Sequence, residues 1–369
     1  MRTAAAALLL FLVGSDIAYA LTCVQGSGYK VSDGKVWYSG AELAGIDAAT
    51  FRQFVPQGPM GPCTAGYAAD SHAVVYEGQR VKSADAATFL VIGANYFGRT
   101  VYARDRYRIY GEGVEISRAV ESFQLLGLGY ATDGTKAFYG QKILPGAGLK
   151  IVGIYAKSTA AVFMDGEPLE GLDPQTFESQ SRFGSDAKKV VWNGRVIEGA
   201  EAASFTVIAT AVDYAKDRFR VYYRRSNEWR IDALPGADPS TIEQIGSYYF
   251  RDARAVYADG KEIVGADPST YRLTKFQRYG VDKHRVYRGL STVPGRDPAT
   301  FDELQHPYSK DKNGVYYEDK PMVDADPMSF QARAEWHARD KNFDYYKDKP
   351  VCIRGGWSRD QLKPCPDDK

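Results

Sequence analysis

The sequence predicts a mainly β fold made of tandem repeats of roughly 30 residues, because one pattern recurs along most of the chain. In its clearest copies an aromatic residue opens the repeat, an aspartate follows three residues later, and a Val-Tyr pair comes next. The copies that begin at Tyr249 and Tyr308 match without a gap. Short runs of β-branched and aromatic residues, each followed by a turn dipeptide, are typical of hairpins. We therefore expect an array of short antiparallel strands.

Opening aromatic residues mark where the repeats start. They lie near Tyr29, Tyr67, Tyr102, Tyr130, Tyr155, Phe183, Tyr214, Tyr249, Tyr279, Tyr308 and Trp336. The pattern weakens in the third to fifth copies, where Ser158 replaces the expected aspartate of the fifth. We expect irregular packing there. Residues that recur in most copies are interpreted first as architecture.

Each repeat is predicted to contain about three strands and one helical turn. Val256-Tyr257 forms one strand of a hairpin, and Lys261 to Ile263 forms the other. Asp259-Gly260 between them suits a two-residue turn, because both central residues of such a turn need positive φ. A further strand, such as Thr206 to Ile208, leads into the next opening aromatic residue.

An Asp-Pro-x-Thr/Ser-aromatic block predicts the helical turn, with the aspartate as its cap and proline at its first position. The last residue of the block should point into the core of the repeat. The residues at this position are Phe51, Phe89, Phe177, Phe205, Ile242, Tyr271, Phe301 and Phe330.

A second aspartate closes the link between the opening strand and the Val-Tyr strand, as in Asp311-Lys312-Asn313. Aspartate closes such links by accepting hydrogen bonds from backbone N–H groups two residues further on. The string also resembles the start of a calcium-binding loop, but the downstream bidentate glutamate is missing. We interpret it as a turn, with a calcium ion held weakly between adjacent repeats as the alternative.

The length of the repeat bears on the architecture. A propeller blade usually needs about 40 residues for its four strands. The shorter repeat favours a solenoid-like or stacked-hairpin array, with a β-propeller-like closed array as the alternative.

Both ends of the chain differ from the repeats. Residues 1–20 combine Arg2, an apolar run and Ala18-Tyr19-Ala20, which predicts a signal peptide cleaved after Ala20 and a periplasmic or secreted protein. No later segment is apolar enough to predict a transmembrane helix. We expect an N-terminal repeat with a disulfide cap over residues 21–66, tandem repeats over 67–335, and a partial repeat with a disulfide cap over 336–369.

Four cysteines support this capped organisation, because disulfides are common in exported proteins. We favour pairing Cys23 with Cys63 and Cys352 with Cys365, since each bond then closes a local loop at one end. A bond between Cys23 and Cys365 would instead close the array into a ring. The spacing lacks the short Cys-x-x-Cys pattern of zinc sites, so no metal is expected.

The runs Tyr308 to Tyr317 and Asp340 to Tyr346 resemble the DKNYY family, a bacterial repeat family named for this string. The resemblance implies tandem repeats in an exported or envelope-associated protein. It supplies no catalytic or ligand residues to transfer to this chain.

Composition and motifs exclude several function classes. Lys plus Arg number 47 against 46 Asp plus Glu, and no basic stripe stands out, which argues against nucleic acid as a partner. His72 and His284 fall on turn positions, His306 precedes Pro307, and His337 follows an opening aromatic residue. No nucleophile, metal or phosphate-binding motif is present, so no cofactor and no enzymatic activity is expected.

Residues outside the repeat template are the candidates for ligand or partner contact. The clearest is Trp229, in an enlarged turn that also contains Arg225 and Arg230. We expect a non-enzymatic exported scaffold that mediates protein interaction in the bacterial envelope. The alternatives are a carbohydrate- or peptidoglycan-binding module that stacks sugars on Trp229, and a hydrolase whose site the sequence does not identify.

Overall fold

The computed structural model describes residues 28–54, 66–95, 100–209, 213–224, 229–333 and 336–354. Within these ranges the chain forms short strands, turns and two 3₁₀ helices, and no α-helix. No helix there is long and apolar enough to cross a membrane. The chain divides into two compact units between Ala187 and Lys188. The predicted signal peptide, Cys23, Cys63, Cys365 and Arg225 lie outside the described residues.

The first unit contains β1 to β21 and one 3₁₀ helix. The elements are β1 (Tyr29–Ser32), β2 (Lys35–Tyr38), β3 (Ala41–Glu42), β4 (Arg52–Gln53), β5 (Tyr67–Ala69), β6 (Val74–Tyr76), β7 (Gln79–Arg80), β8 (Leu90–Asn95), β9 (Thr100–Arg104), β10 (Ile109–Gly111), β11 (Val114–Ser117), η1 (Val120–Ser122), β12 (Gln124–Gly127), β13 (Tyr130–Thr132), β14 (Ala137–Tyr139), β15 (Lys142–Leu144), β16 (Lys150–Val152), β17 (Tyr155–Lys157), β18 (Val162–Met164), β19 (Glu167–Pro168), β20 (Glu178–Gln180) and β21 (Phe183–Ser185).

The second unit contains β22 to β43 and the other 3₁₀ helix. The elements are β22 (Val190–Trp192), β23 (Arg195–Val196), η2 (Ala202–Ser204), β24 (Thr206–Ala209), β25 (Tyr214–Lys216), β26 (Val221–Arg224), β27 (Ile231–Ala233), β28 (Glu243–Gln244), β29 (Tyr249–Arg251), β30 (Val256–Ala258), β31 (Lys261–Glu262), β32 (Arg272–Leu273), β33 (Gly280–Val281), β34 (Val286–Arg288), β35 (Ser291–Thr292), β36 (Asp302–Glu303), β37 (Tyr308–Asp311), β38 (Gly314–Tyr317), β39 (Lys320–Pro321), β40 (Gln331–Ala332), β41 (His337–Arg339), β42 (Phe343–Tyr346) and β43 (Lys349–Ile353).

Small antiparallel sheets are the building blocks of both units, which confirms the predicted β repeat. The first sheet is β1-β2-β3, and later sheets have four strands in sequence order, as in β4-β5-β6-β7 and β28-β29-β30-β31. We expected about three strands per repeat. The fourth fits into so short a repeat because many outer strands have two residues, as β28 and β31 do.

The hairpin turns have the predicted geometry. Asp259 and Gly260 have φ values of 47° and 69°, and Asn193 and Gly194 have 46° and 74°. Positive φ at both central residues matches the right-handed twist of the flanking strands. The dipeptides therefore set the register of the third and fourth strands, as in the pairing of Ala258 with Lys261.

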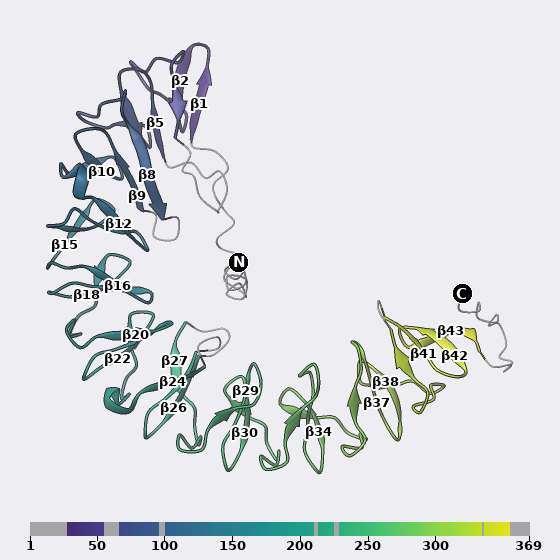
Figure 1. Ribbon diagram of the computed structural model, residues 1–369. Coiled ribbons are helices and arrows are strands. Elements are labelled where there is room, and N and C mark those ends of the chain that lie inside the picture. The colour runs from purple at the N-terminus through teal and green to yellow at the C-terminus, as the bar shows by residue number, and fades with distance from the viewer. Residues whose placement is uncertain are drawn as a thin grey trace, which may run out of the picture. The chain divides into compact units, whose positions relative to one another are not determined.

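The hydrophobic core lies between successive sheets, so central strands of sheets that have a neighbour on either side are buried on both faces. Tyr67 and Ala69 of β5 pack with Tyr110 of the following sheet. Ala68, between them in β5, packs instead with Val36 of the preceding sheet. Side chains alternate between the faces of a strand, and this strand is covered by a sheet on either side. Figure 1 shows the corresponding succession of sheets along each unit.

Most of the predicted core residues at the end of the Asp-Pro block are buried. Phe177 has no exposed surface, and Phe330 and Tyr271 are 2% and 3% exposed. Phe51 and Phe205 are half-buried. The helical turn itself is present, for example where the Tyr271 N–H donates to the Asp267 carbonyl at 2.9 Å.

The opening tyrosine joins one sheet to the next. The Tyr214 hydroxyl accepts a hydrogen bond from the Gly260 N–H at 3.0 Å, and Gly260 lies in the hairpin of the following sheet. Gly260 also lies against the ring of Tyr223, the cross-strand partner of Tyr214. We call this arrangement the tyrosine joint. It recurs between Tyr29 and Gly78, Tyr67 and Gly113, Tyr102 and Gly140, and Tyr130 and Gly166.

Later joints use other groups at the same place. Asp319 takes the hairpin position of glycine with a φ of 66°, and it accepts a hydrogen bond from the Tyr279 hydroxyl at 2.7 Å. The same carboxylate forms an ion pair with Arg288. The hydroxyl of Tyr308 donates to the backbone carbonyls of Trp336 and Lys347.

The last repeat starts one residue later than the sequence indicated. His337 pairs across the sheet with Tyr346, as Tyr308 pairs with Tyr317. Trp336, which we expected to open this repeat, precedes β41 with a φ of 65°. The spacing to the repeat aspartate explains the difference, since Asp340 follows His337 by the same three residues that separate Asp311 from Tyr308.

The joint makes Gly260 intolerant of a side chain. A Cβ atom at Gly260 would lie 1.7 Å from the Tyr223 ring, whereas one at Gly295, which also has positive φ, meets nothing within 4 Å. We predict that Gly295→Ala costs about 1 kcal/mol through backbone strain alone. Gly260→Ala should cost about 1–3 kcal/mol more because the sheets must separate. Urea unfolding of both variants measures the difference, and equal costs would contradict the close contact.

Candidate functional site

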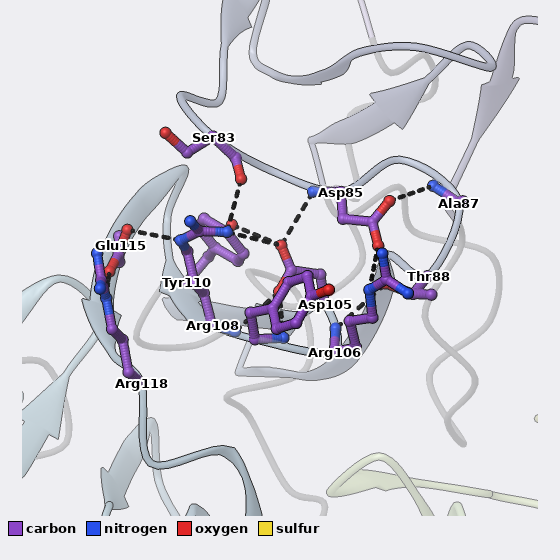
Figure 2. Close-up of polar contacts among 11 residues, drawn as sticks. Ser83, Asp85, Ala87, Thr88, Asp105, Arg106, Arg108, Tyr110, Glu115 and Arg118 are labelled. Carbon is purple, nitrogen blue, oxygen red and sulfur yellow. Dashed lines mark hydrogen bonds and ion pairs between the residues drawn. The ribbon is translucent and has the colours of Figure 1, made fainter.

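The repeat aspartate is the most densely bonded polar side chain in the fold, and Figure 2 shows it for Asp105. Its Oδ1 accepts the N–H groups of Tyr107 and Arg108 at 2.7 and 2.8 Å. Its Oδ2 accepts the Asp85 N–H at 2.9 Å and the Tyr110 hydroxyl at 2.8 Å. Asp105 is 2% exposed. One carboxylate therefore closes its own turn and also holds the preceding Asp-Pro-type turn.

The same contact between turns recurs in both units. In each case the first residue of the preceding turn donates its N–H to Oδ2 of the repeat aspartate. The donor and acceptor pairs are Asp47 and Asp70, Asp173 and Asp186, Glu201 and Asp217, Asp238 and Asp252, Asp267 and Asp282, Asp297 and Asp311, and Asp326 and Asp340. We call this buried aspartate with its donors the aspartate hub.

A tyrosine five residues further on completes most hubs. The Tyr257 hydroxyl donates to Asp252 at 2.9 Å, and the Tyr287 hydroxyl donates to Asp282 at 2.8 Å. Tyr222, Tyr316 and Tyr345 donate in the same way to Asp217, Asp311 and Asp340. Burial and the neighbouring carboxylate raise the pKa of Tyr287 to about 12, so this phenol stays a donor at neutral pH.

At several hubs the hydrogen-bond donors lower the pKa of the aspartate. Burial would raise the pKa of Asp252, but the N–H and hydroxyl groups outweigh burial and hold that pKa below its usual value. For Asp282 too, burial would raise the pKa, but the hydrogen-bond donors outweigh burial and lower it. At Asp133, hydrogen bonds that include the Ser117 hydroxyl overcome burial and lower the pKa to about 2.

The residue after the hub aspartate ties the two turns together at the surface. Arg106 Nε lies 3.1 Å from Asp85 Oδ2, while its N–H donates to the Thr88 hydroxyl (Figure 2). Lys283 and Lys341 form the equivalent ion pairs with Asp267 and Asp326. Such pairs are half-exposed and contribute less than about 1 kcal/mol each. The buried hub carries most of the bonding.

Arg108 adds a further link in the third repeat. Its guanidinium donates to the Ser83 carbonyl at 2.9 Å, and its Nε lies 3.1 Å from Glu115 Oε2. Arg118 reaches the other oxygen of Glu115 at 2.7 Å (Figure 2). The equivalent Arg220 donates to the Gly199 carbonyl.

These contacts give a structural role to the aspartate, the lysine, the asparagine and both tyrosines of the repeated motif. Asp311 is the hub, Lys312 pairs with Asp297, and the Asn313 N–H closes the turn. Tyr316 donates to the hub, and Tyr317 packs on Tyr308 in the joint. Both oxygens of Asp311, considered as a calcium ligand, accept N–H or O–H donors, which a calcium ion would have to displace. The described residues contain no cluster of His, Cys, Asp and Glu arranged for a metal.

The fifth repeat keeps its turn without a carboxylate. Ser158 Oγ accepts the N–H groups of Ala160 and Ala161 and donates to the Pro145 carbonyl at 2.8 Å. In this repeat β16 to β19 still form one sheet. The strand pairing is less regular in the third and fourth repeats, where the register shifts between Ile109 and Tyr110 and between Leu125 and Gly127.

Trp229 occupies the place of a joint. It is 62% exposed, and its ring centroid lies 6.3 Å from that of the buried Trp192. The Trp229 carbonyl accepts a hydrogen bond from Arg195 at 3.3 Å. Arg230 forms an ion pair with Asp232 of the same hairpin, at 3.0 Å. Trp229 therefore lies against Trp192 much as the hairpin glycine lies against Tyr223 elsewhere.

The structure brings together one cluster that the sequence pattern did not reveal. Glu303 is 3% exposed, forms an ion pair with Arg278 and accepts the Phe276 N–H at 3.1 Å. Arg278 also contacts the His306 ring. His72 and His284 are turn residues as predicted, since each donates its N–H to a hub aspartate. Glu303 lies off the repeat template, and no signal in the sequence pairs it with Arg278.

Several exposed apolar side chains lie on the turns that the hubs hold together. We call them the turn edge of their unit, which is Tyr107 in the first unit and Phe219, Val264, Val323 and Met328 in the second. These residues are 53%, 62%, 77%, 92% and 87% exposed. Arg106 and Arg218 each stack on the neighbouring aromatic ring, with 4.6 Å to its centroid.

Replacing a hub aspartate should weaken the fold in a pH-dependent way. In Asp252→Asn the amide nitrogen cannot accept the hydrogen bonds that Oδ2 receives from Asp238 and Tyr257. We predict a loss of about 2–4 kcal/mol in the free energy of unfolding at pH 7. Asp259→Asn, at a hairpin position where Asn193 occurs naturally, should change it by less than about 0.5 kcal/mol.

The sign of the pH effect follows from the lowered pKa of Asp252. The stability that its carboxylate contributes is present above the pKa of the unfolded state, about 3.9, and is lost as pH falls through the lower folded-state pKa. The gap between wild type and Asp252→Asn should therefore shrink from about pH 4 downwards. Urea midpoints across this range measure it, and a constant gap would contradict the ionised hub.

Comparison with known proteins agrees with this reading of the repeats. No curated protein and no solved structure matches the chain significantly. The model of the DKNYY family matches it three times, over residues 29–154, 67–185 and 232–349. The matches begin at opening aromatic residues or strands of the fold and together cover more than half of the chain. The protein therefore belongs to the DKNYY family.

Proposed function

We propose that this protein is an exported, non-enzymatic repeat scaffold that binds a protein partner along its turn edge. The strongest support for this proposal is that the repeated polar groups form hydrogen bonds inside the fold. The hub carboxylates and joint hydroxyls, such as those of Asp105 and Tyr67, are engaged by backbone donors within the fold. The repeated polar groups therefore stabilise the fold and are not available to bind a substrate.

Exposed residues on the turn edge supply the contact surface in this proposal. Val323 and Met328 flank the same Asp-Pro turn, and both are almost fully exposed. Phe219 is held by Arg218, which itself pairs with Glu201. Aromatic residues, methionine and arginine are enriched in the centres of protein interfaces. A stacked array can repeat such contacts along an extended surface.

Export rests on the pattern of residues 1–20, in which a charged start, an apolar run and small residues succeed one another. The cysteines at both ends support an oxidising compartment. Peptide mapping of the protein from its native host tests both points. We predict Leu21 at the mature N-terminus and disulfides between Cys23 and Cys63 and between Cys352 and Cys365. Retention of residues 1–20 with reduced cysteines would contradict export.

Site-specific photocrosslinking in the native host tests the turn edge. A crosslinking amino acid at Phe219 or Val264 should capture a discrete protein, because both side chains lie on the proposed contact surface. The control is Ile143, which is 54% exposed but lies in β15. Phe219→Asp should abolish capture at Val264, and Ile143→Asp should leave it intact. Equal capture at all three positions, or none, would overturn the proposal.

Carbohydrate binding is the second candidate, because the ring of Trp229 is 62% exposed beside Trp192. Aromatic faces of this kind can stack on sugars. Binding of the purified protein to a glycan array and to peptidoglycan, with Trp229→Ala as the matched variant, separates the two candidates. Signal that is lost in Trp229→Ala would favour the sugar site, and a silent array would leave the turn edge as the binding surface.

A further inference from the structure

Among the described residues, the first and last sheets each carry half of a joint that is not completed by a neighbouring sheet. Ser39-Gly40 is the hairpin turn of the first sheet, with φ values of 49° and 89°. A Cβ atom at Gly40 meets nothing within 4 Å, whereas one at Gly78 in the next sheet would lie 2.6 Å from Tyr38. Gly40 has the conformation of a joint glycine, and no preceding ring covers it among the described residues.

At the other end, the ring pair that would receive a hairpin is exposed. His337 and Tyr346 are cross-strand partners whose ring centroids lie 5.1 Å apart. Tyr346 is 41% exposed, while its counterpart Tyr223 is 4% exposed beneath the hairpin of the following sheet. Trp336 beside it is 46% exposed.

The end sheets carry polar residues at positions that are apolar in the internal joints. Between β5 and the first sheet, Ala68 packs against Val36. Between β41 and β38, Ala338 packs against Val315. At the corresponding positions of the end sheets stand Lys30, one residue after Tyr29, and Asp344, two residues before Tyr346. Lys30 is exposed, and both oxygens of the half-buried Asp344 accept hydrogen bonds from Arg354, at 2.6 and 2.9 Å.

The third pair of positions is aromatic on both sides. Tyr257 occupies the position eight residues after the opening residue, and it packs with Tyr214 and Tyr223 of the preceding sheet. Trp37 holds this position in the first sheet. A joint between end sheets would place Trp37 against His337 and Tyr346.

We propose that the last sheet of one copy docks on the first sheet of a second copy, in the same register as an internal joint. Gly40 would lie on Tyr346, Trp37 against His337, and Lys30 against Asp344. The partner is thus a second copy of this chain, bound head to tail. Such a heterologous contact leaves one end open on each copy and adds further copies in turn. The polar pair at its centre makes this contact reversible, unlike the apolar internal joints.

Blocking one end at a time tests this arrangement. Gly40→Ala places a Cβ atom where the hairpin would lie on Tyr346, and Tyr346→Ala removes that ring. Both positions are exposed, so neither change should prevent folding. Gly295→Ala and Tyr248→Ala are the matched controls, because they make the same changes at exposed residues away from the end sheets and from the turn edge. Sedimentation velocity of the purified full chain over a range of concentrations gives the assembly state.

The wild type and both controls should form species larger than dimers as concentration rises. Each blocked variant should raise the dissociation constant at least about tenfold, as expected for a side chain forced into a packed contact or for a lost anchor. An equimolar mixture of the two variants should form a dimer and nothing larger, since one good end remains on each. A monomeric wild type, blocked variants that assemble normally, or a mixture that stays monomeric would each overturn the proposal.

This inference does not depend on the partner proposed for the turn edge. Assembly is measured with the purified chain alone, whereas capture at Phe219 and Val264 is measured in the native host. Failure of either experiment leaves the other conclusion untouched.

Discussion

The fold depends on a buried carboxylate that serves two consecutive turns at once. Asp252 accepts the N–H groups of its own turn and that of Asp238 in the turn before it. Hydrogen bonds to a charged group contribute about 1.5–3 kcal/mol each. A strand of two or three residues cannot provide such stability by itself. The hub therefore connects the sheets through their turns, where a short repeat would otherwise be weakest.

The tyrosine joint supplies the second connection, at the hairpin end of the same sheets. The joint requires the hydroxyl of the opening tyrosine, the aromatic ring of its cross-strand partner, and a glycine in the hairpin of the following sheet. Where one of these three is missing, another side chain makes the contact. Asp319 binds the Tyr279 hydroxyl directly, and Trp229 covers Trp192. These exchanges show that the position of the contact is preserved even when its chemistry changes.

Much of this fold could be predicted from the sequence, because its local signals act within a few residues. The Asp259-Gly260 turn, the aspartate turns and the buried residue after Asp-Pro all follow from backbone preferences and from hydrophobicity. The short outer strands could not be predicted, since strands such as Lys261–Glu262 are exposed, polar and held by their neighbours. A strand of that kind has no hydrophobic alternation to reveal it.

Contacts between repeats could not be predicted from the sequence either. The bond from Gly260 to Tyr214 spans 46 positions, and the pairing of Arg278 with Glu303 spans 25. The sequence shows that these residues recur or stand out, but it does not show which repeat they reach. The start of the last repeat was misplaced for the same reason, because Trp336 looks like an opening aromatic residue while His337 carries the register. For Trp229, the sequence identified an unusual residue, and the structure adds the ring it covers.

These assignments narrow the search for function to surfaces that the hubs and joints leave exposed. The aspartate hub also holds the turns between the short strands, such as those of Asp238 and Asp267. Hydrogen exchange resolved to single amides tests it most directly. The N–H groups of Asp238 and Asp267, which lie in turns outside the sheets, should exchange as slowly as those of central strands. Exchange as fast as that of exposed turn amides would contradict the hub.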